Sequence, residues 1–201
     1  EQANEWQSMA QTPMMIAIDG EWGLGMRIND GLSYPYQMTL GAITNDSLIA
    51  EMGRQIAEQC VRLGINVNFA PDIDVNNEPN NPVIGFRSFG EDPDNVARKG
   101  TAYALALQNN GVLPSMKHFP GHGNTVTDSH HALPIVKNSL EEINKTELVP
   151  FKYMIENGVK GAMVGHLYFP ALEPVINKSS SLSRIIVTDL LKNEMNYDGI
   201  I

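Results

Sequence analysis

The sequence of 201 residues predicts an α/β fold, specifically a partial (β/α)₈ barrel of the TIM type with about four βα units and one trailing strand. Three observations support this prediction. Short apolar runs alternate with longer amphipathic stretches, polar side chains follow the apolar runs, and no glycine- or serine-rich linker divides the chain. Regular alternation of strands and helices builds a parallel sheet. Because no linker divides the chain, we expect a single domain over residues 1–201.

Five short apolar runs are expected to form the buried strands of this sheet. Their lengths suit strands better than helices, and glycine, proline or asparagine stands near most of their ends. In chain order they are 14–18, 65–70, 112–116, 161–164 and 199–201.

Four helices are expected between these strands. The first repeats apolar residues at the spacing of one helix face. Aspartate before proline, a capping box of serine and glutamate, and glycine after the last turn are recognised end signals. The expected helices are 45–63 followed by Gly64, 92–110 beginning with Asp92 and Pro93, 139–157 beginning with the capping box of Ser139 and Glu142, and 183–195.

Polar side chains at the strand ends favour a barrel over an open sheet. A barrel builds its active site from the loops after many strands, whereas an open sheet concentrates its site at one switch point, usually with a G-x-G-x-x-G turn that is absent here. A whole barrel needs eight units and about 250 residues, so we expect the chain to be an internal fragment of one. The strand-end residues are Asp19, Asp72, Asp74, Lys117, His118 and His166.

Composition excludes several functional classes. A formal charge of −9 and a pI near 4.9 argue against non-specific binding to nucleic acid or anionic membranes. No run of about 18 apolar residues is present, so we expect no membrane span. The single cysteine, Cys60, lies on the apolar face of a predicted helix, and we expect it in the core.

Four of the five histidines fall within 117–131, directly after a predicted strand. His130 can donate and accept a proton near neutral pH, and Asp128 could orient its ring. Spacing alone supports equally well a loop histidine that caps a helix or binds a backbone carbonyl. Ser129 has no G-x-S-x-G context, which argues against a nucleophilic role.

Other residues allow alternative interpretations. His118, His122 and His130 could bind a metal, but Pro120 and Gly121 prevent the helical alignment that such a site would need, and Lys117 disfavours a cation. We expect no metal and no cofactor. Asp19 with Trp22 could hold a sugar, although Trp22 could equally be a packing residue. Arg87 could instead form a structural ion pair with Asp74.

The segment Lys-His-Phe-Pro-Gly-His-Gly at 117–123, followed by Asp-Ser-His at 128–130, resembles the signature of β-N-acetylglucosaminidases in glycoside hydrolase family 3. The segments 68–76, 84–90 and 166–170 are also similar to that family, so the resemblance covers nearly the whole chain. It implies a (β/α)₈-type barrel and retaining, exo-acting hydrolysis of terminal β-linked N-acetylglucosamine from cell-wall or chitin-type oligosaccharides. The implied partner is a carbohydrate substrate, and the implied compartment is bacterial cytoplasm or periplasm.

The resemblance also implies residue roles. His130 would be the general acid/base, paired with Asp128. The sugar-binding residues would be Asp19, Arg27, Arg87, Lys117 and His118.

Two departures from the family pattern matter. The family's Asp-Gln-Glu-Gly-Gly is here Asp-Gly-Glu-Trp-Gly at 19–23, which alters the loop beside the sugar. The family's nucleophilic aspartate would lie beyond the strand 199–201, so we expect the chain by itself to be inactive. A β-glucosidase-type enzyme, a phosphorolytic reaction and a non-catalytic sugar-binding fragment remain alternatives.

Overall fold

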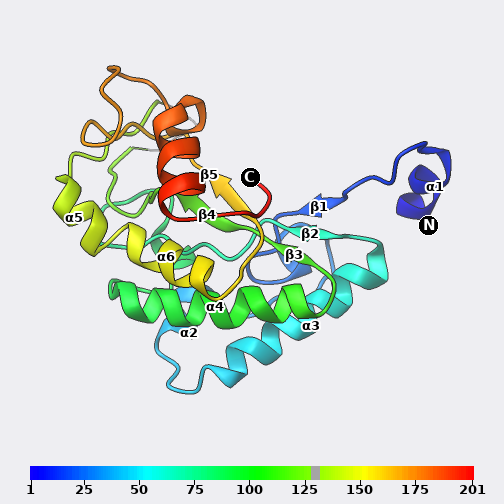
Figure 1. The fold of residues 1–201 in the computed structure, drawn as a ribbon. Helices are drawn as coiled ribbons and strands as arrows, with labels where there is room; N and C mark the ends of the chain where they lie inside the picture. The colour runs from blue at the N-terminus through cyan, green and yellow to red at the C-terminus, as the bar shows by residue number, and fades with distance from the viewer. Residues whose placement is uncertain (128–131) are drawn as a thin grey trace.

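The computed structural model describes residues 1–127 and 132–201 (Figure 1). It confirms the predicted α/β class with parallel strands. In chain order the elements are α1 (Gln2–Met9), β1 (Ala17–Ile18), η1 (Leu24–Met26), α2 (Gln37–Gly41), α3 (Ser47–Leu63), β2 (Val67–Asn68), η2 (Gly85–Arg87), α4 (Pro93–Asn109), β3 (Leu113–Pro114), β4 (Met116–Phe119), α5 (Leu140–Lys145), α6 (Leu148–Glu156), β5 (Ala162–Val164), η3 (Ser180–Leu182) and the π-helix η4 (Ile185–Glu194).

Within each of two small sheets, each strand lies beside the next one along the chain. β1, β2 and β3 form one parallel sheet in that order, and β4 pairs in parallel with β5. A further parallel bridge joins Gly161 to Ile200, where the trailing strand was predicted. Asp72 and Lys117 also form a parallel bridge, which connects the chain after β2 to β4. This order brings the carboxyl ends of successive strands to one edge.

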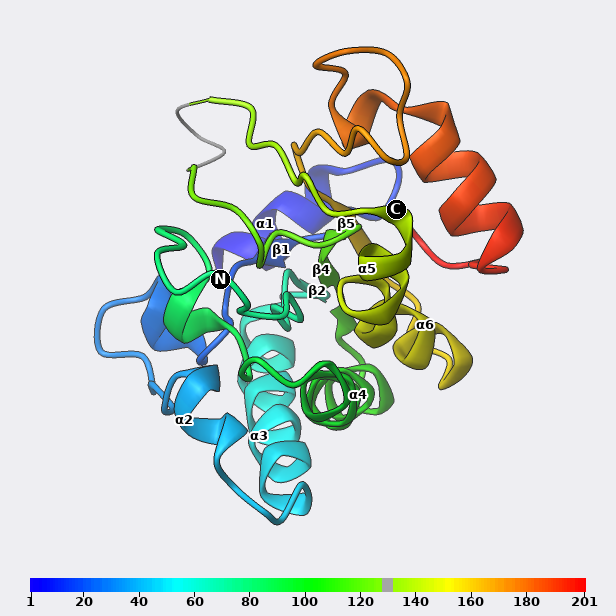
Figure 2. The same ribbon diagram turned by 90° about the vertical axis from the view of Figure 1, so that its left-hand side faces the viewer.

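The helices α3, α4 and α6 pack along one side of the strands, as Figures 1 and 2 show from two directions. α3 buries Ile49, Met52, Ile56 and Cys60, so the expected burial of the cysteine is confirmed. Within the described residues, no helix combines the length and hydrophobicity needed to cross a bilayer.

The predicted helix ends are largely confirmed. The Asp92 side chain accepts hydrogen bonds from the first turn of α4, and the capping box of Ser139 and Glu142 is present. Gly64 ends α3 with a φ of 77°, in the left-handed region that glycine adopts most easily.

Three boundaries differ from expectation. The predicted strand 112–116 is divided into β3 and β4, and β4 continues to Phe119. The expected helix 139–157 is interrupted between α5 and α6, because Pro150 has no N–H to donate to the carbonyl of Thr146. The last predicted helix forms as the π-helix η4 rather than an α-helix.

Candidate active site

A cavity of about 590 Å³ lies at the carboxyl ends of the strands. Its wall includes all five residues predicted to bind sugar, together with Glu21, His122 and His166. The predicted acid/base pair, Asp128 and His130, lies outside the described residues. The predicted five are Asp19 after β1, Arg27 after η1, Arg87 at the end of η2, and Lys117 and His118 in β4.

Asp19 and Arg27 form the more exposed part of the cavity wall, which we call the rim. Arg27 Nη2 lies 3.4 Å from one Asp19 carboxylate oxygen, and Lys117 Nζ lies 3.2 Å from the other. Both rim side chains remain partly exposed, so their hydrogen-bonding capacity is available to a ligand in the cavity.

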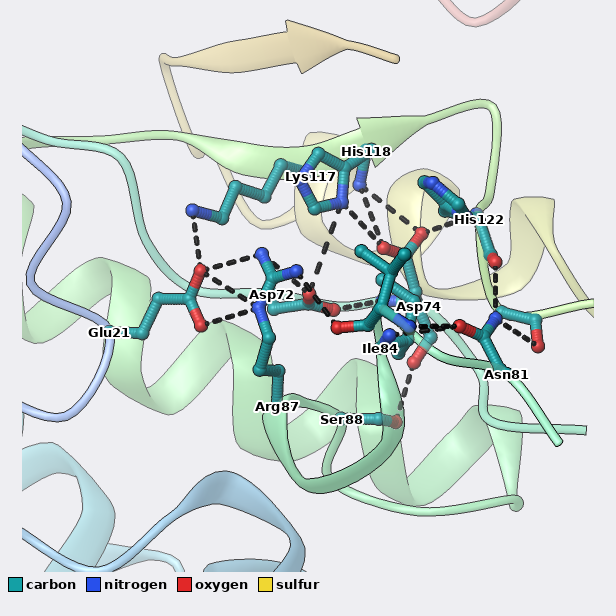
Figure 3. Close-up of polar contacts among 12 residues, drawn as sticks. Glu21, Asp72, Asp74, Asn81, Ile84, Arg87, Ser88, Lys117, His118 and His122 are labelled. Carbon is teal, nitrogen blue, oxygen red and sulfur yellow. Dashed lines mark hydrogen bonds and ion pairs between the residues drawn. The ribbon is translucent and has the colours of Figure 1, made fainter. Parts of the chain in front are cut away.

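Glu21 is buried and holds two cations in place (Figure 3). Its carboxylate accepts hydrogen bonds from Arg87 Nε at 2.9 Å and Nη2 at 2.8 Å, and lies 2.6 Å from Lys117 Nζ. Burial would raise the pKa of Glu21, but the hydrogen bonds from Arg87 and the charge of Lys117 outweigh it and lower the pKa. The carboxylate is therefore a fixed anion that orients both cations.

The backbone beside Glu21 is held by buried side chains rather than by its own loop. Asn68 in β2 accepts from the Gly20 N–H at 2.9 Å and donates to the Gly20 carbonyl at 3.1 Å. The Tyr103 hydroxyl in α4 lies 3.1 Å from the carbonyl oxygens of Gly20 and Glu21. These bonds fix where Asp19 and Glu21 leave the main chain.

Asp74 organises the opposite side of the cavity (Figure 3). Its carboxylate lies 2.7 Å from His118 Nδ1 and accepts the backbone N–H groups of His118 at 3.2 Å and His122 at 2.7 Å. Burial would raise the pKa of Asp74, but its interaction with the His118 ring and the hydrogen bonds from His118 and His122 outweigh the burial and lower the pKa to about 2.

His118 is thereby oriented toward the cavity. Burial lowers its pKa, and the neighbouring Asp74 offsets this only in part. A neutral ring that donates its Nδ1–H to Asp74 leaves Nε2 as an acceptor. His118 can therefore accept a hydrogen bond from a ligand hydroxyl.

Asp72 lies between the two networks. Its carboxyl accepts from the Asp74 N–H at 3.0 Å and lies 3.3 Å from Arg87 Nη2. Burial and the charge of Asp74 raise the pKa of Asp72 well above its ordinary value. The cations Arg87 and Lys117 thus meet the acidic side chains of Glu21, Asp72 and Asp74 at the base of the cavity, which we call the floor.

The glycine-rich loop after β4 is tightly packed. A Cβ at Gly123 would lie 1.7 Å from the Val75 carbonyl oxygen, which explains the need for glycine. The Asn81 side-chain amide donates to the carbonyls of His122 at 2.9 Å and Gly123 at 3.1 Å. These contacts position the loop that leads toward Asp128 and His130 in the sequence.

The metal alternative named His118, His122 and His130, of which His130 lies outside the described residues. The described residues that could cluster around an ion are Asp72, Asp74 and His118, with ligand atoms within 4.8 Å of one another. His118 Nδ1 is bound to Asp74, and Arg87 lies against Asp72. The His122 Nδ1 atom contacts Thr125 Oγ1 at 2.8 Å. The Nδ1 atoms of both histidines are therefore engaged, whereas His122 Nε2 has no hydrogen-bond partner among the described residues.

Two sequence-based alternatives can be compared with the structure. Arg87 does form structural ion pairs, but with Glu21 and Asp72 rather than with Asp74, because Asp74 is turned toward His118. Trp22 packs against Tyr36, with ring centroids 4.7 Å apart and an interplanar angle of 77°.

The roles of Glu21 and Asp74, which hold the other side chains of the cavity in place, were not predicted from the sequence. Glu21 has the i, i+2 spacing from Asp19 that places side chains on one face of an extended chain, and this signal could have identified it. Asp74 was predicted as a strand-end residue and a possible partner of Arg87, because its contacts with His118 and His122 depend on a pairing across more than forty residues of sequence.

The whole chain, residues 1–201, matches the model of the glycosyl hydrolase family 3 N-terminal domain. Beta-hexosaminidase A of Pseudoalteromonas piscicida is 41% identical over 96% of the chain and 35% of its own length. A glycoside hydrolase family 3 β-N-acetylglucosaminidase from Paenibacillus superposes with a TM-score of 0.94 at 42% identity, covering 98% of this chain and 39% of that one.

A third relative is the NagZ structure from Neisseria gonorrhoeae in complex with N-trifluoroacetyl-D-glucosamine. It has a TM-score of 0.86 at 29% identity, covering 98% of this chain and 60% of that one. The chain thus spans between about one third and three fifths of the length of these relatives. Together with the family model that covers it entirely, these similarities show that the chain belongs to glycosyl hydrolase family 3, as its N-terminal, TIM-barrel-like α/β domain.

Proposed function

We propose that the protein containing this chain is a retaining, exo-acting β-N-acetylglucosaminidase that hydrolyses terminal β-linked N-acetylglucosamine from cell-wall or chitin-type oligosaccharides. The observation that carries the proposal is the cavity in which the five predicted sugar-binding residues meet. The names of relatives that match over nearly the whole chain support the same substrate.

The cavity suits a polyhydroxylated ligand because its polar groups are fixed before a ligand arrives. Asp19 can accept hydrogen bonds from hydroxyls, Arg27 and Lys117 can donate, and His118 Nε2 can accept. Preorganised donors and acceptors cost little reorganisation on binding, which favours both affinity and catalysis.

In the proposed reaction, His130 is the general acid/base and Asp128 orients it. A nucleophilic carboxylate, placed by the family resemblance outside residues 1–201, attacks the anomeric carbon. The bond to the leaving oxygen breaks as His130 gives that oxygen a proton. In the second step His130 takes a proton from water, whose oxygen attacks the anomeric carbon and releases the carboxylate.

We further infer that residues 1–201 supply one domain with about four βα units and a trailing strand of a (β/α)₈ barrel. The parallel order β1 to β5 and the bridge from Gly161 to Ile200 support this arrangement. The single chain is then expected to be inactive in an assay in which the longer protein is active.

The test compares two leaving groups in the longer protein. His130→Ala should reduce kcat/KM for N-acetylglucosamine oligomers by about 10²- to 10⁴-fold, because kcat/KM reports the first step and a sugar alkoxide needs a proton to depart. It should reduce kcat/KM for the 2,4-dinitrophenyl glycoside much less, because that phenolate leaves without protonation. The value of kcat should fall for both substrates, because the second step needs His130 as a base. Asp19→Asn, which weakens a contact to the sugar itself, should reduce both kcat/KM values to a similar extent. Equal losses of kcat/KM for both leaving groups in His130→Ala would contradict the assignment.

A further inference from the structure

Three aromatic side chains gather beside the cavity and take no part in the proposed chemistry. They are Trp22, Tyr36 and Phe86, which we call the aromatic patch. The Tyr36 and Phe86 rings are stacked with centroids 6.1 Å apart and an interplanar angle of 27°, and Trp22 meets Tyr36 edge-on. Phe86 is 72% exposed although it is one of the most hydrophobic residues in the chain.

The patch is continuous with the cavity. Its three rings surround a hollow of about 300 Å³ whose wall also contains Val83 and Arg87. These last two residues line the cavity as well, so the two spaces share one wall. A chain of sugar rings longer than the cavity could therefore pass from one space to the other.

The loop that carries Phe86 is rigidly built, so its exposure is not a sign of a loose segment. The Asn81 side chain accepts from the N–H groups of Val83 and Ile84, each at 2.9 Å. Arg87 Nη1 donates to the Val83 carbonyl at 3.1 Å, while its other nitrogens are held by Glu21. The aromatic surface is thus presented to solvent by a fixed scaffold.

The chemistry of this surface suits a sugar ring. An exposed apolar patch marks a binding surface, and the face of an aromatic ring carries partial negative charge that attracts polarised C–H groups. One face of a pyranose presents such C–H groups while its hydroxyls stay in water. The charge of Arg87 is balanced by Glu21, so the shared wall favours no particular charge on the ligand.

We propose that the aromatic patch binds a second pyranose ring of the oligosaccharide whose terminal residue occupies the cavity. This inference rests on the proposed function for the identity of the ligand as an N-acetylglucosamine oligomer.

The test measures binding, so that it does not depend on turnover. In the longer protein carrying His130→Ala, the Kd for N-acetylglucosamine and for its dimer and trimer is measured by titration calorimetry. The dimer should bind more tightly than the monosaccharide. Phe86→Ala should weaken dimer binding by roughly fivefold to tenfold and leave monosaccharide binding within twofold. Phe86→Tyr should retain the tighter binding of the dimer.

Ile176→Ala is the matched control, since Ile176 is 79% exposed and lies outside the patch. It should change neither Kd. Equal affinity for monosaccharide and dimer in the parent, or an unchanged ratio in Phe86→Ala, would overturn the inference. A marked drop in the Tm of Phe86→Ala without a change in the ratio would also overturn it, because the patch would then be covered by another segment of the longer protein. Failure of the turnover assay would count against the enzyme proposal alone.

Discussion

The floor and the rim of the cavity use the same residue types in opposite ways. On the floor, Glu21 is fully buried, and its shortest contacts are 2.8 Å to Arg87 and 2.6 Å to Lys117. On the rim, Arg27 is 51% exposed and lies 3.4 Å from Asp19. A short buried ion pair is costly to break, whereas a long exposed one contributes little to stability. The floor therefore maintains the architecture, and the rim is left free to exchange its contacts for those of a ligand.

The largest effect on stability is expected from Glu21→Ala. It leaves Arg87 and Lys117 buried without their common carboxylate, which should lower the free energy of unfolding by about 3–5 kcal/mol. Urea denaturation followed by circular dichroism measures the change. A loss below about 1 kcal/mol would show that the floor is no more structural than the rim.

The next effect concerns the carboxyl of Glu147, which is buried beside the glycine-rich loop. Its hydrogen-bond partner is an uncharged amide. Glu147 accepts from the Asn138 amide at 3.2 Å, and burial raises its pKa to about 7. Two other acids, Glu142 and Asp74, raise the pKa further, and no cation among residues 1–127 and 132–201 compensates for the burial as Arg87 does for Glu21.

Because the folded-state pKa of Glu147 exceeds the unfolded value, the folded protein binds more protons between about pH 4.5 and pH 7. The contribution of the Glu147 carboxyl to the free energy of unfolding is complete below that range and is lost as the pH rises through 7. Relative to Glu147→Gln, the wild type should lose up to about 1.4 kcal/mol per pH unit across this interval. Parallel pH dependences of the two proteins would show that the carboxyl is ionised in the folded state.

The smallest effect on stability is expected from Asp19→Asn on the rim. Its ion pairs are long and partly exposed, so the free energy of unfolding should change by less than about 1 kcal/mol. In the longer protein, kcat/KM should nevertheless fall on the order of 10²-fold, since a charged contact to the sugar is lost. A stability loss as large as that of Glu21→Ala would remove the distinction between floor and rim.

The sequence was sufficient to predict the features that depend on local signals. The helix starts at Asp92 and Ser139 follow from capping chemistry. Asp19 and Lys117 could be placed together because the carboxyl ends of parallel strands share an edge. The break before α6 was also locally encoded, by Pro150, but a continuous apolar periodicity obscured it.

Features that depend on long-range pairing could not be predicted. Glu21 meets Arg87 across 66 residues of sequence, and which carboxylate Arg87 chooses depends on how two loops pack. The preference of Asp74 for His118 has the same origin, and so Asp74 was named as the alternative partner of Arg87. The strand-end residues could be identified from the sequence, but which of them pair with one another could not.

The hydrogen bonds that anchor the loop after β1 have a consequence for the residue at position 22. Asn68 and Tyr103 form hydrogen bonds to the main chain at Gly20 and Glu21. The position of Asp19 therefore does not depend on which side chain stands after Glu21. The side chain at position 22 packs against Tyr36 and is not one of these anchors. A different side chain there would therefore change the surface beside the cavity and leave Asp19 and Glu21 in place.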